Sequence, residues 1–147
     1  MDRAPIKLAL IGAGRWGKCF ISTINQMAEV ELVALISSKP ENSVLVPNTC
    51  RVVADWRDII SSEDIEGVIV ATPPATHFHI AKAAIKAGKP VLIEKPVTMD
   101  VQQAEDLLKL SRRMDVPVLV DHPHLFSAAY NKLKAALGEI GTITKII

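Results

Sequence analysis

The sequence has few cysteines, no block of like charge and no long apolar run, and each absence removes a class of protein. Cys19 and Cys50 are its two cysteines and lie far apart, so neither a disulfide framework nor a metal-binding cysteine pattern is expected. We expect two reduced thiols in a cytoplasmic protein. The 17 basic and 16 acidic residues give a net charge of +1 without a basic cluster, which argues against a nucleic-acid partner. With no signal peptide and no apolar stretch of spanning length, no membrane partner is expected.

What the sequence does have is a high share of hydrophobic residues in alternating strand-like and helix-like segments. They make up 49% of 147 residues, which suits a single domain with a large buried core. Apolar runs predict strands over 6–11, 31–36, 51–53, 67–71, 90–93, 117–120 and 142–147. Helices are expected over 15–28, 55–60, 75–87, 99–114 and 127–137, and a loop over 40–50. The alternation predicts an α/β fold: a three-layer doubly wound parallel sheet (Rossmann fold) with helices on both faces.

Two smaller interpretations concern the helices. Thr98 is expected to cap the helix over 99–114, with Asp100 favourable in its first turn. Trp56 lies at a helical spacing that suits a buried face, so we favour packing over a ligand-binding role for its ring.

The most informative stretch is the first predicted strand, which runs directly into Gly-x-Gly-x-x-Gly at Gly12, Gly14 and Gly17 and then into a helix. Between a strand and a helix, this spacing is typical of a dinucleotide-binding turn. Gly12 would allow the tight turn, Gly14 the close approach of a pyrophosphate, and Gly17 the close packing of helix on strand. The free N–H groups of the helix would then face the phosphates.

The end of the second predicted strand bears on the choice of cofactor. An acidic residue about 20 positions past the glycines would bind the ribose 2′-hydroxyl. That region here is Ser37-Ser38-Lys39, whose hydroxyls and amine could hold a 2′-phosphate. We therefore favour NADP over NAD. Two alternatives stay open: the segment is an ordinary solvated loop, or Glu41 supplies the carboxylate.

Further polar motifs follow the other predicted strands, and the carboxyl ends of parallel strands gather at one edge of a sheet. They are Thr72-Pro73-Pro74, Glu94-Lys95-Pro96 and Asp121-His122-Pro123-His124. The last resembles a metal cluster. However, no second cluster supplies more ligands, so no metal is expected.

Four landmarks occur in order: Gly12-Ala13-Gly14-Arg15-Trp16-Gly17, Ala71-Thr72-Pro73-Pro74-Ala75-Thr76-His77, Glu94-Lys95-Pro96 and Gly138-Glu139-Ile140-Gly141-Thr142-Ile143. The set resembles the glucose-fructose oxidoreductase / inositol dehydrogenase / rhizopine catabolism (Gfo/Idh/MocA) family over nearly the whole chain. The resemblance implies an NAD(P)-dependent oxidoreductase with two domains, acting mostly on sugars and cyclitols. The segment Leu125 to Ala129 also resembles one found in members that act on nucleotide sugars and aminosugars.

The resemblance also implies roles at matching positions. Cofactor contacts are implied for Gly12, Gly14, Arg15, Trp16, Gly17, Ser37, Ser38, Lys39, Ala71, Thr72, Pro73, His77, Glu94 and Lys95. Lys95 would face nicotinamide and substrate as a catalytic residue, and His122 is a second catalytic candidate. The resemblance also implies a cis peptide bond between Lys95 and Pro96. An amine that loses water near a cationic ring releases its proton more easily, so it can exchange a proton with a substrate hydroxyl.

For the domains, we expect a dinucleotide-binding domain over 1–124, then a linking helix and the first strand of a C-terminal α/β domain over 125–147. We expect the chain to be a cofactor-domain fragment of a longer enzyme that carries the rest of that substrate domain. Such a chain would bind NAD(P) weakly, turn over little, and self-associate through surfaces the missing domain would cover. An alternative is a non-catalytic NAD(P)-binding sensor or regulatory module; a methyltransferase is a weaker one, since the glycine spacing and Glu-Lys-Pro argue against it.

Overall fold

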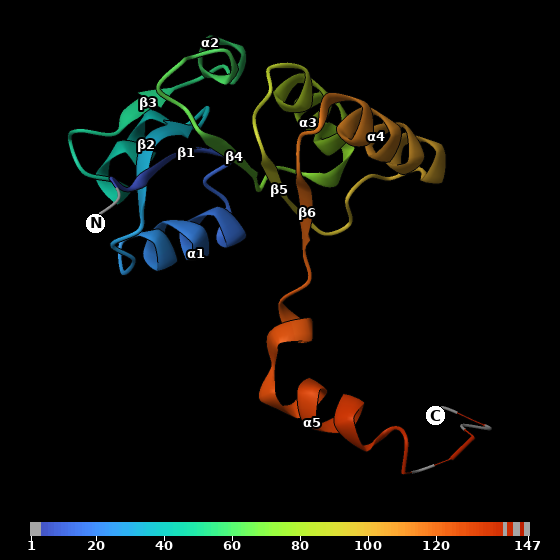
Figure 1. Cartoon of the computed structure of the whole chain (residues 1–147). Helices are drawn as coiled ribbons and strands as arrows, with labels where there is room; N and C mark the ends of the chain where they lie inside the picture. Colours follow the sequence, from blue (N-terminus) through green and yellow to red (C-terminus); the bar gives the residue numbers. More distant parts are fainter. Residues whose placement is uncertain (1–3, 140, 143–144, 146–147) are drawn as a thin grey trace.

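The computed structural model describes residues 4–139, 141–142 and 145, and it contains one sheet of six parallel strands (Figure 1). The strands are β1 (Ile6–Ile11), β2 (Val30–Ile36), β3 (Arg51–Val53), β4 (Gly67–Val70), β5 (Val91–Glu94) and β6 (Val118–Asp121). The helices are α1 (Arg15–Ile24), α2 (Arg57–Ile60), α3 (Pro74–Lys86), α4 (Val101–Met114) and α5 (Ala128–Ala136), with 3₁₀ helices η1 (Pro40–Leu45) and η2 (Pro123–Phe126). The predicted doubly wound α/β fold is confirmed.

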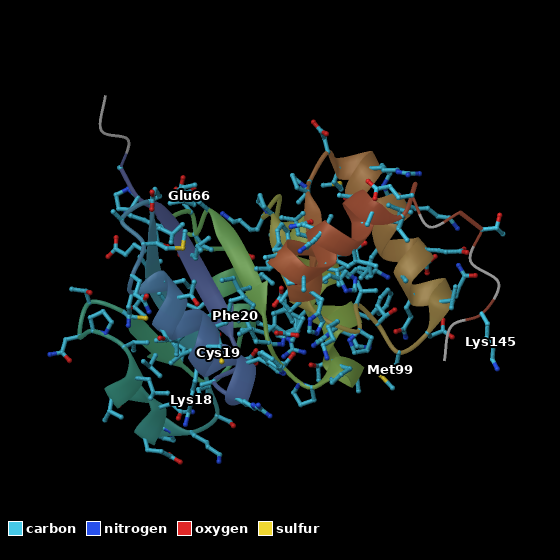
Figure 2. The ribbon with its side chains drawn as sticks, turned by 90° about the horizontal axis from the view of Figure 1, so that it is seen from below. Lys18, Cys19, Phe20, Glu66, Met99 and Lys145 are labelled. Carbon is cyan, nitrogen blue, oxygen red and sulfur yellow. The ribbon has the colours of Figure 1, made fainter. Side chains whose placement is uncertain are left out.

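The strand order places the centre of the sheet at the glycine turn. The order is β3-β2-β1-β4-β5-β6, so the chain builds outward from β1 in one direction and then returns to build outward in the other. The reversal falls between β1 and β4, and in open parallel sheets the crevice for a ligand forms at such a switch point, beyond the carboxyl ends of the strands. In Figure 2, Lys18 and Met99 lie toward that edge, and Glu66 lies at the opposite edge.

Side chains alternate along the central strands between two cores. Ala9 and Ile11 of β1 pack with α2, α3 and α4 in one cluster, whereas Leu10 packs with α1 in the other. Val68 and Val70 of β4 join the first cluster and Ile69 the second, as the two-residue period of a strand requires. Because both faces are covered, residues 8–11 of β1 and 67–70 of β4 are all apolar or glycine. The three layers visible in Figure 1 follow from this pattern.

The start of α4 differs from the sequence-based expectation. Its N-cap is Asp100, not Thr98: the Asp100 carboxylate accepts a hydrogen bond from the Gln103 N–H at 3.1 Å. Thr98 is buried, and its hydroxyl donates to the Asp100 carbonyl at 2.7 Å. A carboxylate caps well because it also complements the positive end of the helix dipole, so the helix begins two residues later than expected.

Other boundaries also shift. α1 ends at Ile24 rather than near residue 28, and the expected loop over 40–50 contains η1, which begins with proline. η2, which also begins with proline, lies between β6 and α5, where no element was expected.

Beyond β6 the chain leaves the sheet. η2 and α5 lie away from it in Figure 1, and Phe126 is 82% exposed. The strand expected over 142–147 falls largely outside the described residues. Within that range the structure describes 142 and 145, and neither is in a strand. Among the described helices, none combines the length and apolar character that a membrane crossing requires.

Candidate cofactor site

A cleft of about 860 Å³ lies at the carboxyl edge of the sheet, beside the switch point. It is lined by the glycine turn, by the segment after β2, and by residues that follow β3 and β4. Ten of the predicted cofactor-binding residues line it: Gly12, Gly14, Arg15, Trp16, Ser37, Ser38, Lys39, Ala71, Thr72 and Pro73. The structure therefore brings together three motifs that are well separated in the sequence.

The three glycines of the turn have different surroundings. Gly12 has φ +104°, and a Cβ there would lie 2.5 Å from the Ala71 carbonyl oxygen. A Cβ on Gly17 would overlap the Gly12 carbonyl oxygen, so this glycine lets α1 pack against the turn. Around Gly14 there is nothing within 4 Å of where a Cβ would lie. Gly12 and Gly17 are thus required by the fold itself, whereas Gly14 leaves open space in the cleft.

The start of α1 faces that open space with unsatisfied donors. No side chain caps the helix, and its first turn contains no acidic residue. The first N–H groups of a helix lack partners within the helix, and they carry partial positive charge. Arg15 and Lys18 add two cations at the rim, with the Arg15 guanidinium 5.7 Å from the centre of the Trp16 ring. This arrangement fits a pyrophosphate group.

The segment after β2 is a small hydrogen-bonded loop. The Ser37 hydroxyl accepts from the Lys39 N–H at 3.2 Å and from the Asn42 side-chain amide at 2.8 Å, so it organises the loop. Ser38 and Lys39 are exposed at the cleft. Glu41, the alternative carboxylate, is exposed and is not among the residues that line the cleft. Among those lining residues there is no aspartate or glutamate, which leaves a wall of hydroxyl, amide and amine groups for the adenosine ribose.

The sequence analysis did not assign every residue that lines the cleft, and Asn42 and Trp56 are two examples. Asn42 lines the cleft, and its position soon after a buried strand is the signal that could have found it. Trp56 was interpreted as packing, yet it is half-buried, packs against the core and also lines the cleft. The Arg57 guanidinium lies 4.4 Å from the centre of its ring. Packing alone is therefore an incomplete description of Trp56.

After β4 the chain forms a turn that is rich in proline. The Thr76 hydroxyl lies 2.7 Å from that of Thr72 and donates to the Pro73 carbonyl at 2.8 Å. Thr72, Pro73 and Thr76 line the cleft. His77 was expected to contact the cofactor, but it is fully buried and is not among the lining residues. The ring lies in the first turn of α3, and its two nitrogens lie within hydrogen-bonding distance of the Pro96 and Thr72 carbonyl oxygens.

Lys95 lies outside the main cleft, in a smaller pocket at the same edge of the sheet. This pocket has a volume of about 380 Å³ and is lined by Lys95, His122, Pro123, His124 and Leu125. The structure thus places both predicted catalytic residues together, on the segments that follow β5 and β6. The Lys95–Pro96 peptide bond is cis, as the resemblance implied.

Glu94 was also expected to contact the cofactor, but it is 6% exposed and is not among the residues that line either pocket. Its carboxylate accepts a hydrogen bond from the Lys95 N–H at 3.2 Å. Burial raises the pKa of Glu94, and the Asp121 carboxylate, which is paired with it in the sheet register, raises it further. Glu94 therefore supports the turn that carries Lys95, beneath the surface that a cofactor could reach.

Comparison with known proteins adds independent information. A family model described as "Oxidoreductase family, NAD-binding Rossmann fold" matches residues 6–122. Inositol 2-dehydrogenase 1 of Mycolicibacterium vanbaalenii is 31% identical over 145 residues, which is 94% of this chain and 42% of that protein. The chain spans about two fifths of the length of the curated relatives that it matches.

Two solved structures show the same fold. A candidate oxidoreductase from Magnetospirillum magnetotacticum is 50% identical, with a TM-score of 0.87 over 95% of this chain and 45% of that chain. Biliverdin reductase from Synechocystis, solved with biliverdin and NADP⁺, is 25% identical, with a TM-score of 0.83 over 94% of this chain and 44% of that chain.

Proposed function

This chain belongs to the Gfo/Idh/MocA family of oxidoreductases with an NAD-binding Rossmann fold, and from that premise we propose that it is the cofactor-binding part of an NAD(P)-dependent dehydrogenase. The reaction would transfer hydride between nicotinamide and a secondary alcohol or ketone of a sugar, cyclitol or nucleotide sugar. The relative named as an inositol 2-dehydrogenase supports this class of substrate.

The observation that carries the proposal is the open space at Gly14 in front of an uncapped α1. A dinucleotide would place its pyrophosphate there, because the backbone is accessible and the first N–H groups are free. Arg15 and Lys18 would neutralise the remaining charge from the rim. The other two glycines hold the turn and the helix in place around this space.

NADP is the proposed preferred cofactor, with NAD as the second choice. A 2′-phosphate would meet the exposed Ser38 hydroxyl and Lys39 amine, and the residues that line the cleft include no carboxylate to repel it. The Asn42 amide, which is bonded to Ser37, supports the shape of the loop. The two unpaired thiols, Cys19 and Cys50, support a proposal that the protein works in a reducing, cytoplasmic compartment.

We assign the proton-transfer role to Lys95 and a substrate-orienting role to His122. The bound nicotinamide would supply hydride acceptance or donation. In the direction of oxidation, the Lys95 amine would take the proton of the substrate hydroxyl as the carbon loses its hydride, and in reduction it would return that proton. His122 lines the same pocket and can hydrogen-bond the substrate's neighbouring hydroxyls.

The proposed domain arrangement is supported by the length of the relatives, of which the chain spans about two fifths. Residues 1–124 would form the dinucleotide-binding domain, and 125–147 would lead into a substrate domain like the one expected in the longer relatives. The exposed apolar side chains Phe126, Leu133 and Leu137 support this, since they would pack against such a domain or against a second copy of the chain.

Calorimetric titration of the purified chain with NADPH and with NADH tests the cofactor proposal. We expect binding of both, tighter for NADPH, and loss of the difference in Lys39→Ala because the 2′-phosphate then loses its cation. One charge-assisted contact corresponds to roughly tenfold in affinity. Lys89→Ala is not a suitable control because the Lys89 amine bonds two backbone carbonyls. Lys132→Ala, on the exposed face of α5, is the matched control.

Three outcomes separate the possibilities. Tighter binding of NADH would overturn the NADP preference and leave the enzyme class standing. Equal loss of both cofactors in Lys39→Ala would assign Lys39 to a phosphate common to both. Binding of neither cofactor to the folded chain would remove the support that the Gly14 space gives to the proposal.

A further inference from the structure

His77 contacts two backbone carbonyls on two different segments of the proposed active site. Its Nδ1 lies 2.9 Å from the Pro96 carbonyl oxygen, and its Nε2 lies 2.8 Å from the Thr72 carbonyl oxygen. The side chain is 0% exposed. Thr72 lines the cofactor cleft, and Pro96 is bonded to Lys95, so the ring lies between the cofactor loop and the turn that carries the proposed catalytic amine.

These two segments have few other means of holding together. The ladder between β4 and β5 ends at the pair Val70 and Ile93, before either segment begins. Prolines at 73, 74 and 96 have no N–H to donate across the gap. Beyond the last pair of the β4–β5 ladder, the His77 ring contacts a backbone carbonyl on each of the two segments.

The chemistry of the ring suits this position. Imidazole has a nitrogen on each side, and an N–H on either one donates to a carbonyl. A neutral ring donates to one of the two carbonyls, and a ring with a proton on both nitrogens donates to both. The spacing of the two nitrogens in a rigid plane fixes the separation of the two carbonyls, and a flexible side chain would not do this.

We propose that His77 is a positioning residue that holds the Thr72 loop and the Lys95 turn in one relative arrangement, so that the cofactor and the catalytic amine stay aligned. The inference rests on the proposed function, because the alignment matters only if both segments serve one reaction. His77 does not touch the reacting atoms and acts through the two carbonyls. The competing interpretation is a buried histidine that adds stability and nothing more.

Two substitutions separate the contacts. An asparagine amide can place a donor where Nδ1 lies, so His77→Asn keeps the contact to Pro96 and loses that to Thr72. A glutamine amide reaches the position of Nε2, so His77→Gln keeps the contact to the Thr72 carbonyl and loses the contact to the Pro96 carbonyl. His79→Asn and His79→Gln are the matched controls, since His79 is exposed on the same helix and lies outside both pockets.

The experiment combines NADPH titration, thermal unfolding and ¹H–¹⁵N NMR spectra of the 16.0 kDa chain. For His77→Asn we expect NADPH affinity to fall about fivefold, the value of one hydrogen bond, with the amide signals of Lys95 and Val97 unmoved. For His77→Gln we expect the reverse: affinity within about twofold of the wild type, and shifted Lys95 and Val97 signals.

A purely structural histidine gives a different pattern. If both variants lower the melting temperature and the affinity together, or if neither moves the Lys95 and Val97 signals, the positioning role is overturned. Should the wild-type chain fail to bind NADPH, the proposed function fails, but the amide signals of the two variants still decide whether His77 links the segments. The two failures are therefore distinguishable.

Discussion

Exchange of glycine for alanine at two positions of the phosphate turn should separate binding from stability. At Gly14 the backbone is extended, with φ −71° and ψ −165°, which alanine also adopts, and the site of a Cβ is open. As an N-cap, alanine is worse than glycine by about 0.5 kcal/mol. The loss of unfolded-state freedom stabilises the folded chain by about 0.4–1 kcal/mol. These effects nearly cancel, so the melting temperature of Gly14→Ala should stay within about 2 °C of the wild type.

The same substitution should weaken cofactor binding. The added methyl group would fill the space in front of the first N–H groups of α1, which the proposed pyrophosphate needs. We expect NADPH affinity to fall at least about tenfold, equivalent to about 1.4 kcal/mol. At Gly17 the order reverses, because the methyl group meets the Gly12 carbonyl and must push α1 away from the turn. Overpacking of this kind costs about 1–3 kcal/mol, or several degrees in melting temperature.

The assay is a melting curve and an NADPH titration on each variant, with Gly138→Ala as the control. Gly138 follows α5, has open space around it and is not among the residues that line the cleft, so it measures the general effect of replacing glycine by alanine. The reasoning is refuted if Gly14→Ala binds NADPH as the wild type does, or if it melts as early as Gly17→Ala.

Three further outcomes follow from individual side chains. Burial raises the pKa of the Cys50 thiol to about 11, so Ellman's reagent should modify the exposed Cys19 rapidly and Cys50 only on unfolding, and Cys19→Ser should leave no fast-reacting thiol. The pKa of Glu94 is raised in the folded chain, so the folded state binds its proton more tightly, and the free energy of unfolding should fall as pH rises above the usual glutamate range. Urea unfolding at several pH values between about pH 4 and pH 7 gives the slope of unfolding free energy against pH. Glu94→Gln should make this slope less negative, and an unchanged slope would contradict the prediction. In urea unfolding, Asp100→Ala should lower the unfolding free energy by about 1 kcal/mol because α4 loses its N-cap, whereas Asp100→Asn should retain most of the stability that the cap contributes.

The sheet and the phosphate turn were predictable because each depends on the residue types within a short stretch of sequence. Apolar runs specify strands that are buried on both faces, and the turn needs glycine at Gly12 and Gly17 for reasons of backbone geometry alone. Element ends were less predictable. Thr98 and Asp100 both suit a helix N-cap, and the choice between them depends on the burial of Thr98 against the fold.

The fate of individual site residues depended on contacts that the sequence does not contain. His77 and Glu94 belong to the expected motifs, yet both turn inward to hold backbone atoms. Trp56 lies at a helical spacing that indicates packing, yet part of its ring reaches the cleft because α2 is a single short turn at the rim of the sheet. Which side of a loop a side chain occupies is decided by tertiary packing.

Motif residues line two pockets, and the two proposed tasks, dinucleotide binding and proton transfer, place different demands on them. Groups that hold a dinucleotide through its phosphates can come from the backbone of one continuous strand–turn–helix segment, because N–H groups and a helix dipole need no particular side chain. The proposed proton transfer would need one amine at one place, and Lys95 lies on a loop beyond the last pair of the β4–β5 ladder. Two buried side chains contact that loop: the Glu94 carboxylate accepts from the Lys95 N–H at 3.2 Å, and His77 Nδ1 lies 2.9 Å from the Pro96 carbonyl oxygen. The position of the Lys95 amine would then depend on two buried side chains, Glu94 and His77, that do not line either pocket.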